Sequence, residues 1–266
     1  MTLRRWLRKL YPLHWLNRTS TIALERCQYL WLARHHGIDF YPETPLARLS
    51  KDMCAVDLLR RLQVEHPWIP ASLFPGAGSA DHKLLYVLGR ALAEFRFRSI
   101  LELGAGETTK ILDAFARQTG HRVTTLEHDA DWVQRVRNRG LADTHMLLHC
   151  PLVTYEDKLA GLYRWYDLTK VSSALNDRFD LFVVDGPVGT RYFSRFGFAR
   201  FFPTRRGDDW LLLWDDLDRV GDLQSFAALV DELRSARSEF GHRLIVSGRT
   251  LGAVFTPAFE AVRYYL

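Results

Sequence analysis

The sequence predicts an α/β fold in which a mostly parallel, seven-stranded sheet carries helices on both faces. Two observations predict it. From residue 81 onward, short apolar segments alternate with segments of helical periodicity, and such alternation needs crossover connections that make the strands parallel. The chain then ends in two apolar segments joined by a tight turn at 248–250. That turn adds an antiparallel pair at one edge of the sheet.

The first part of the chain is expected to be helical and basic. In residues 3–11 apolar and basic side chains mostly occupy opposite helix faces: Leu3, Trp6, Leu7 and Leu10 against Arg4, Arg5, Arg8 and Lys9. A second helix is expected from Ser20 to His36, ending at Gly37, and a short one at 55–64 between proline-containing turns. We place a boundary at about Gly78. Residues 1–78 then form a basic amphipathic helical extension, and residues 79–266 form the main domain.

The main domain is expected to begin with a helix from Asp81 to Phe95. Apolar segments predict five strands, at 99–103, 122–126, 145–149, 180–184 and 210–214. Helical periodicity between them predicts helices at 109–119, 130–138 and 221–238. The terminal pair of strands is expected at 243–247 and 251–255.

The segment at 99–109 is the strongest functional signal. An apolar strand leads into Gly104-Ala105-Gly106, and a helix follows at once, so backbone N–H groups at the helix start can face a ligand. Glu127 ends the next strand about 20 residues further on, where a carboxylate can accept both hydroxyls of a ribose. A dinucleotide site would want a third glycine where Thr109 stands. Glu102, before the turn, could instead bind the amino group of an amino-acid ligand, which favours S-adenosylmethionine.

At this motif the chain resembles the class I S-adenosylmethionine-dependent methyltransferases, and later segments are similar to an uncharacterised bacterial small-molecule or glycan-type subgroup. Those segments are Pro151-Leu152, Trp165-Tyr166-Asp167, 179–187 and 211–216. The resemblance covers about residues 80–266. It implies a Rossmann-like methyltransferase fold, and it implies that Leu152 borders the adenine. The predicted cofactor-binding residues are Glu102, Gly104, Ala105, Gly106, Thr108, Glu127, His128 and Leu152.

Carboxylates are also expected where the later strands end. Asp185 follows the strand at 180–184, and Asp215 and Asp216 follow the strand at 210–214. Asp185 could act as a general base on an acceptor hydroxyl. Alternatively, the three carboxylates could hold a Mg2+ ion, which prefers oxygen ligands. A structural role is the third interpretation. We predict Asp185, Asp215 and Asp216 as catalytic residues and as candidate metal ligands.

Arginines and aromatic residues alternate after residue 187, from Arg191 to Arg206. Arg191 and Arg195 are four residues apart and would share one face of a helix. Guanidinium groups beside a reaction centre can hold an anionic or sugar acceptor, so we predict both as substrate-binding residues. A solvated face above an aromatic core is the alternative.

Charge and cysteine content limit the remaining possibilities. The formal net charge is +5, and the excess lies entirely in residues 1–48. Residues 1–18 therefore suggest either association with an anionic membrane surface or a helix docked on the domain. Nucleic acid is not expected as a partner, since the rest of the chain has no net charge and carries no recognition motif. Three cysteines at wide spacing indicate no disulfide framework, and this predicts a cytoplasmic protein, peripheral on the inner face of the membrane if the association holds.

Together these features predict methyl transfer from S-adenosylmethionine to a hydroxyl of a glycan, a lipid-linked sugar or a small metabolite. Two alternatives stay open. The first is a scaffold that binds the cofactor without transferring the methyl group. The second is transfer to nitrogen.

Overall fold

A seven-stranded sheet forms the centre of the computed structural model, which describes residues 30–38, 44–76, 78–171, 175 and 178–266. The strand order is β3-β2-β1-β6-β7-β9-β8. The strands are β1 (Ser99–Leu103), β2 (Arg122–Glu127), β3 (His145–His149), β6 (Phe179–Val184), β7 (Arg206–Trp214), β8 (Gly241–Val246) and β9 (Thr250–Phe255).

Strand pairing confirms the predicted fold class. The pairs among β3, β2, β1, β6 and β7 are all parallel, whereas β9 runs antiparallel to both β7 and β8. One reversed strand near the edge of a seven-stranded parallel sheet is the Rossmann-like methyltransferase arrangement that the sequence predicts. From β1 the chain continues to β2 and β3 on one side and later to β6 and β7 on the other. The order therefore reverses between β1 and β6, which is where open α/β sheets bind ligands.

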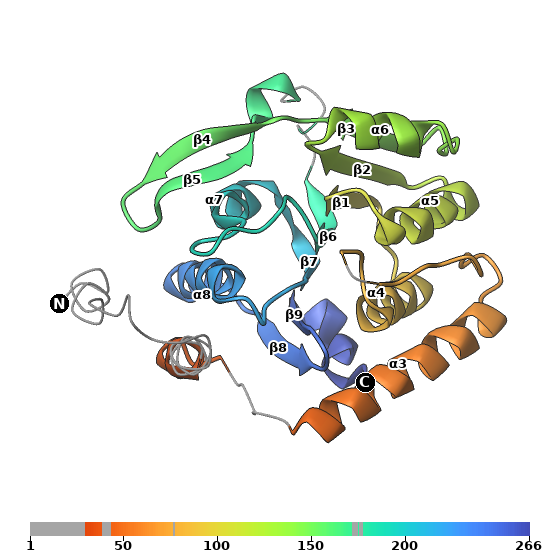
Figure 1. Ribbon diagram of the computed structural model, residues 1–266, viewed down its shortest axis with the longest axis horizontal. Coiled ribbons are helices and arrows are strands. Elements are labelled where there is room, and N and C mark those ends of the chain that lie inside the picture. The colour runs from red at the N-terminus through yellow and green to blue at the C-terminus, as the bar shows by residue number, and fades with distance from the viewer. Residues whose placement is uncertain (1–29, 39–43, 77, 172–174, 176–177) are drawn as a thin grey trace, which may run out of the picture.

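Helices cover both faces of the sheet (Figure 1). One side carries α4, α5 and α6, and the other carries α7 and α8. Their bounds are α4 (His82–Glu94), α5 (Glu107–Thr119), α6 (Ala130–Arg137), α7 (Phe196–Arg205) and α8 (Val220–Ser235). The chain ends in the 3-10 helix η3 (Pro257–Tyr264). Alternate residues of the central strands enter two hydrophobic clusters, one on each face: Phe182 and Leu212 in the first, Leu181 and Leu211 in the second.

The helix expected at 55–64 is longer than predicted, because α3 spans Pro45–Glu65. A proline-containing turn is expected at Pro45, but the Thr44 side chain accepts a hydrogen bond from the Ala47 N–H at 3.2 Å and caps the helix there. Proline is tolerated at the first helical position, since that N–H has no partner within the helix. Leu59 and Leu62 of α3 pack in the same cluster as Leu84 of α4.

Residues 1–29, 39–43 and 77 of the predicted extension lie outside the described residues. The expected helix at 3–11 falls in the first of these ranges, and of the expected helix Ser20–His36 only residues from 30 onward are described. Residues 30–35 are helical, and Gly37 adopts a positive φ of 56° at the predicted end. Among the described helices, none has the length and apolar character needed to cross a membrane.

Two further elements were not predicted as strands. β4 (Leu152–Asp157) and β5 (Gly161–Tyr166) pair antiparallel as a separate hairpin that extends from the main sheet (Figure 1). On its inner side Tyr163 packs edge-on against Phe196 of α7, with ring centroids 5.3 Å apart.

Candidate functional site

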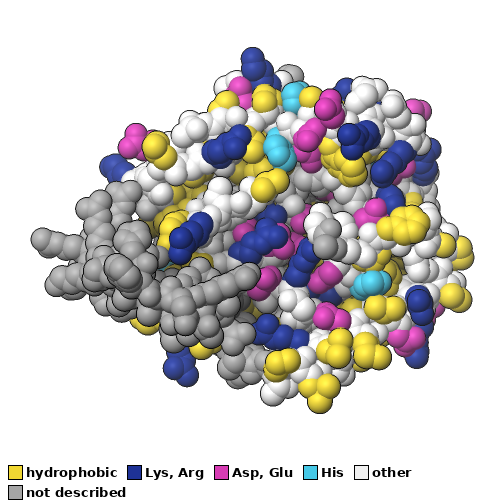
Figure 2. Space-filling model, in the orientation of Figure 1, with side chains coloured by type: hydrophobic (Ala, Val, Ile, Leu, Met, Phe, Trp, Pro, Cys, Tyr) yellow, Lys and Arg dark blue, Asp and Glu magenta, His cyan; other side chains and the backbone are white. Residues whose placement is uncertain are grey.

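The predicted site residues lie where the parallel strands end. Glu127 is the last residue of β2, and Gly104, Asp185 and Asp215 directly follow β1, β6 and β7 in that order. In Figure 2 acidic and basic side chains gather near the middle of the face in view, over the position of β7 in Figure 1. Carboxyl ends of parallel strands meet at one edge of a sheet, so the fold brings these residues together.

Two glycines bring the loops after β1 and β6 into direct contact. Gly104 has a φ of 91°, and a Cβ on it would lie 2.9 Å from the Gly186 Cα. A Cβ on Gly186 would lie 2.6 Å from the Gly104 Cα. Real Cβ atoms do not approach backbone that closely, and positive φ is costly for other residues. This Gly104–Gly186 contact therefore places the glycine-rich loop next to Asp185.

Gly106 is different, because it is the point where the loop is open. It caps α5 with an extended φ of −169°. A Cβ built there would meet no atom of the described residues within 4 Å. The first turn of α5 begins immediately after it, so a ligand can approach the helix N-terminus at this position.

Glu127 holds the same loop from the neighbouring strand. Its Oε2 accepts the Ala105 N–H at 3.0 Å, and its Oε1 accepts the N–H groups of His128 and Asp129 at 2.6 and 2.8 Å. Burial alone would raise the pKa of Glu127, but hydrogen bonds from the His128 ring, Asp129 and Ala105 outweigh it and lower the pKa. The hydrogen bond to Glu127 in turn raises the pKa of His128. Glu127 is thus an ionised acceptor beside the open end of the loop.

Glu102 and Thr108 lie behind the loop, inside the protein. Both have 0% exposure. The Glu102 carboxylate accepts hydrogen bonds from the hydroxyls of Thr108, Thr109 and Thr125 at 2.6, 2.9 and 2.7 Å. Burial raises the pKa of Glu102 despite these bonds. Thr109, at the position of the missing third glycine, also accepts the Gly106 N–H at 2.7 Å, so these residues shape the loop from within.

Asp185, Asp215 and Asp216 form a compact acidic cluster. One carboxylate oxygen from each lies within 4.8 Å of the others. Asp215 has 0% exposure, and neither of its carboxylate oxygens has a hydrogen-bond partner among the described residues. Asp216 adopts a positive φ of 63° and pairs through Oδ2 with Arg219 at 2.9 Å. The predicted convergence of the strand-end carboxylates is therefore present in the structure.

Burial and mutual repulsion both change the acidity of this cluster. Burial raises the pKa of Asp185 to about 8, and the neighbouring charge of Asp215 adds to the shift while Arg195 opposes it. Burial and then the charge of Asp216 raise the pKa of Asp215. Asp185 can therefore take up a proton near neutral pH, as a general base must.

Arg195 and Arg191 occupy different environments. Arg195 is 4% exposed, and its guanidinium donates to the carbonyls of Pro187, Asp215 and Asp185 at 3.1, 3.1 and 3.2 Å. It also pairs with Asp216 at 3.0 Å and with Asp222 at 3.4 Å. Its nitrogens thus have their partners inside the protein. Arg191 is exposed and lies 5.4 Å from the Tyr192 ring centroid.

Several residues at this edge escaped the sequence analysis. Trp132 of α6 donates from Nε1 to the Ala105 carbonyl at 2.8 Å and so supports the glycine-rich loop. Arg249, in the β8–β9 turn, lies 3.6 Å from Asp215 and binds the Ser79 carbonyl at 2.8 Å. Lys83 is 1% exposed and pairs with Asp81 at 2.7 Å. In an α/β fold, a helix that precedes a strand begins near the carboxyl end of that strand. Lys83 lies at the start of α4, which precedes β1, so this rule could have predicted its position at this edge of the sheet.

The donor set of the acidic cluster fits a magnesium-class ion. Such ions take carboxylate oxygens, and one carboxylate oxygen from each of the three aspartates lies within 4.8 Å of the others. Arg249 Nη1 lies 3.6 Å from Asp215 Oδ2 and 3.9 Å from Asp216 Oδ1. The guanidinium and an ion would therefore compete for the same oxygens.

Leu152, the remaining predicted cofactor-binding residue, begins β4 and packs against the first hydrophobic cluster.

The sequence matches no protein-family model and no curated protein. Among solved structures, the chain is similar to the SAH-bound Podospora anserina methyltransferase PaMTH1, with 14% identity and a TM-score of 0.49 over 81% of this chain and 97% of that one. It is also similar to an O-methyltransferase from Bacillus cereus in complex with SAH, with 15% identity and a TM-score of 0.43 over 86% and 100% of the two chains. At these identities the likeness does not extend to substrates.

Proposed function

We propose that this protein transfers a methyl group from S-adenosylmethionine to a hydroxyl of a glycan, a lipid-linked sugar or another small metabolite. The Gly104–Gly186 contact carries the proposal, because it puts the open glycine-rich loop beside a carboxylate whose pKa is raised to about 8. A cofactor on this loop would have its sulfonium near Asp185. Methyl transfer to oxygen needs a base at that point.

The chain's own residues supply distinct parts of the reaction. Glu127, ionised and held by backbone N–H groups, would accept the ribose hydroxyls. The space at Gly106 would admit the cofactor close to the backbone. Asp185 would remove the acceptor's proton as the methyl group moves to the oxygen. Arg195 fixes the Asp185 and Asp215 backbone, and so acts as a positioning residue.

The acidic cluster also supports a metal-assisted version of the same reaction. Asp185, Asp215 and Asp216 would hold the ion. When bound, magnesium would lower the pKa of the acceptor hydroxyl and orient it. Chelation separates the two versions, since EDTA abolishes a metal-dependent activity and leaves activity through a free carboxylate unchanged.

Cofactor binding and transfer are tested separately. Calorimetry should give micromolar-range binding of S-adenosylmethionine or its demethylated product, about −8 kcal/mol. A screen of sugars, lipid-linked glycans, phenols and amines then identifies the acceptor. Absence of cofactor binding would refute the proposal. Binding without transfer to any acceptor would favour the scaffold alternative, and transfer only to amines would favour the N-methyltransferase.

We also propose that residues 1–18 bring the protein to an anionic membrane surface on the cytoplasmic side. The support is the sequence alone: basic residues and tryptophans with no acidic residue before Glu25. Membrane proximity would suit a lipid-linked acceptor.

A further inference from the structure

A chain of hydrogen-bonded side chains runs beneath the glycine-rich loop, from Glu102 to Asp113. Thr125 Oγ1 lies 2.7 Å from Glu102 Oε2 and 2.8 Å from His145 Nε2. The other ring nitrogen of His145, Nδ1, lies 3.3 Å from Asp113 Oδ1. Glu102, Thr125 and His145 are all buried. The proposed reaction gives no role to the last three members of this Glu102–Asp113 chain.

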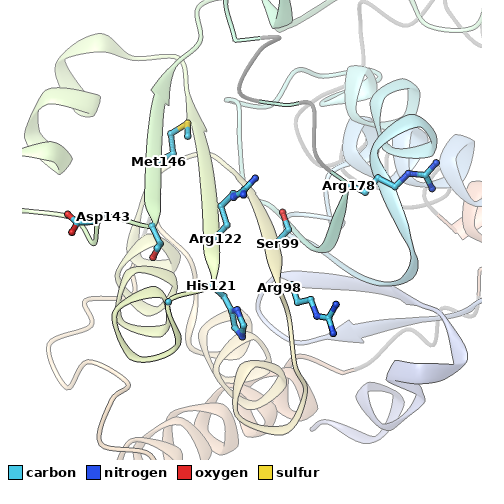
Figure 3. Close-up of a pocket in the computed structure, with 9 residues that line it drawn as sticks. Arg98, Ser99, His121, Arg122, Asp143, Met146 and Arg178 are labelled. Carbon is cyan, nitrogen blue, oxygen red and sulfur yellow. The ribbon is translucent and has the colours of Figure 1, made fainter.

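The strands place the chain on the face of the sheet that α5 covers, and α5 supplies its last member. In the parallel register Glu102 of β1 and Leu147 of β3 are both level with Thr125 of β2. His145 is two residues before Leu147, and side chains alternate along a strand, so His145 lies on the same face. Met146, between them, is exposed and lines a cavity of about 590 Å3 at the amino ends of the strands (Figure 3).

Asp113 fixes one proton on the His145 ring. Burial alone would raise the pKa of Asp113, but hydrogen bonds from His145, from the Ala142 N–H and from the Arg117 side chain outweigh it and lower the pKa. An ionised carboxylate only accepts hydrogen bonds. His145 Nδ1 must therefore donate to Asp113, so Nδ1 carries a proton in every arrangement of the chain.

The contacts of Thr125 then allow two arrangements, because a hydroxyl has a single hydrogen to donate. If Glu102 is ionised, Thr125 donates to Glu102, and His145 Nε2 carries a second proton that it donates to Thr125. If Glu102 is protonated, it donates to Thr125, and Thr125 donates to a bare Nε2. Both arrangements keep every contact and contain the same number of protons. They differ in charge, since the first is an ion pair and the second is neutral.

Burial favours the neutral arrangement when no ligand is bound. The Glu102 and His145 side chains are both fully buried, and burial raises the pKa of Glu102 despite its three hydroxyl partners. A buried ion pair must repay the loss of hydration of both charges. A positive charge brought close to Glu102 would stabilise its ionised form and so favour the other arrangement.

Glu102 is also connected to the point where the glycine-rich loop is open. Its Oε2 accepts the Thr109 hydroxyl at 2.9 Å, and Thr109 accepts the Gly106 N–H at 2.7 Å. Its Oε1 accepts the Thr108 hydroxyl at 2.6 Å. Only the first turn of α5 therefore separates Glu102 from a ligand at Gly106, and an ionised Glu102 would attract a positive group on that ligand.

We propose that His145 is a positioning residue for the cofactor, because it takes up a proton from the chain when the positively charged amino group of S-adenosylmethionine binds at the loop. Glu102 Oε2 gives its proton to Thr125 Oγ1, and Thr125 gives its own proton to His145 Nε2. The O–H bond of Glu102 breaks and an N–H bond on His145 forms, so no proton is exchanged with solvent. The inference rests on the proposed function, since its ligand is the methyl donor or the demethylated product.

Two ligands that differ at the amino-acid end test the proposal by calorimetry on the full chain. S-adenosylhomocysteine, the demethylated product, carries the amino group, whereas methylthioadenosine keeps the adenosine and the sulfur but lacks the amino-acid end. His145→Gln places an amide where the ring was and cannot take up a proton. It should weaken S-adenosylhomocysteine binding roughly tenfold or more, and methylthioadenosine binding by less than about twofold. Thr125→Val, which keeps the shape and breaks the chain, should have the same effect.

His121→Gln is the matched control and should leave both affinities unchanged. His121 directly precedes β2 at the amino ends of the strands (Figure 3) and is not a member of the Glu102–Asp113 chain. Thermal unfolding of each variant checks that it is folded. If His145→Gln weakened both ligands equally, or neither, the role of His145 would be structural and the proposal would be overturned.

Nitrogen NMR of the histidine rings follows the proton directly. The resonance of His145 Nε2 is assigned by its absence from His145→Gln. This nitrogen should be bare in the unliganded protein and protonated in the complex with S-adenosylhomocysteine. An unchanged Nε2 in a protein that binds the ligand would overturn the proton shift and leave the proposed function standing. Absence of S-adenosylhomocysteine binding to the wild type would overturn the proposed function, and this inference with it.

Discussion

Replacing Glu127 with glutamine removes one negative charge at the proposed ribose position while keeping the size of the side chain. In the structure this carboxylate accepts three backbone N–H groups, from Ala105, His128 and Asp129. The amide keeps one acceptor oxygen and turns an N–H group toward the other donors. Glu127→Gln should therefore weaken both the loop and its grip on a ribose.

The size of the binding effect follows from the number of bonds. Hydrogen bonds to a charged group contribute about 1.5–3 kcal/mol, against about 1 kcal/mol for a neutral pair. Two ribose hydroxyls that lose a charged acceptor should each lose about 1 kcal/mol. The sum of about 2 kcal/mol corresponds to a roughly thirtyfold higher Kd for S-adenosylmethionine.

Calorimetry at a temperature where both proteins are folded measures this change. Glu156→Gln on the exposed face of β4 is the control and should leave Kd unchanged. A Kd for Glu127→Gln within twofold of the wild-type value, in a folded protein, would refute the ribose assignment.

The same substitution should change the acid stability. The pKa of Glu127 is lowered from an ordinary value of 4.5, so its contribution to folding is complete above that pH and is lost as pH falls through the native pKa. Glu127→Gln should remove part of the acid destabilisation below about pH 4.5, measured by urea unfolding between pH 7 and pH 3. An unchanged acid limb would contradict the lowered pKa.

Three further predictions concern the loop, the base and the N-terminus. Gly104→Ala should destabilise the protein by about 1–3 kcal/mol in urea unfolding, because its positive φ and its contact with Gly186 exclude a Cβ, whereas Gly106→Ala should fold normally and lose cofactor affinity. Equal stability of these two variants would contradict that reasoning. Asp185→Asn should lower turnover roughly a hundredfold, while its cofactor affinity stays within a few-fold of the wild-type value. Wild-type turnover should rise with pH up to about 8, since the base acts deprotonated. Full activity of the variant would exclude Asp185 as the base. The protein should pellet with vesicles that contain anionic lipid, and less of it should pellet as the salt concentration rises. Replacing the four basic residues of 3–11 with glutamine should abolish this pelleting. Pelleting of that variant would favour the alternative in which residues 1–18 dock on the domain.

The sequence predicted the residues that the parallel strands position. Glu127 ends its strand, and Gly104, Asp185 and Asp215 each directly follow one. Parallel pairing brings strand ends to one edge of the sheet whatever the side-chain details. The predicted helix is shorter than α3 because proline occurs both in turns and at the first position of a helix, and the sequence alone does not distinguish the two at Pro45. The cap from Thr44 decides between them.

Contacts between side chains that are far apart in the sequence could not be predicted from local sequence patterns. Arg195 was predicted to hold substrate, but its contacts come from Asp216 and Asp222, which only the folded topology brings near. Arg249 gave no signal of its own, since a basic residue in a hairpin turn is ordinary on a surface. Its proximity to Asp215 depends on β8 running parallel to β7 through the intervening β9.

The contacts of Arg195 have a consequence for the energetics of any reaction at the acidic cluster. One guanidinium bonds to the carbonyls of residues 185, 187 and 215, so the loops after β6 and β7 cannot rearrange independently. Dipoles that are already fixed need no reorientation when charge moves, which lowers the reorganisation energy of a proton or methyl transfer. The backbone at Asp185 and Asp215 should therefore be as ordered without ligands as with them. Backbone NMR order parameters at these residues should be high in the unliganded protein and unchanged on cofactor binding.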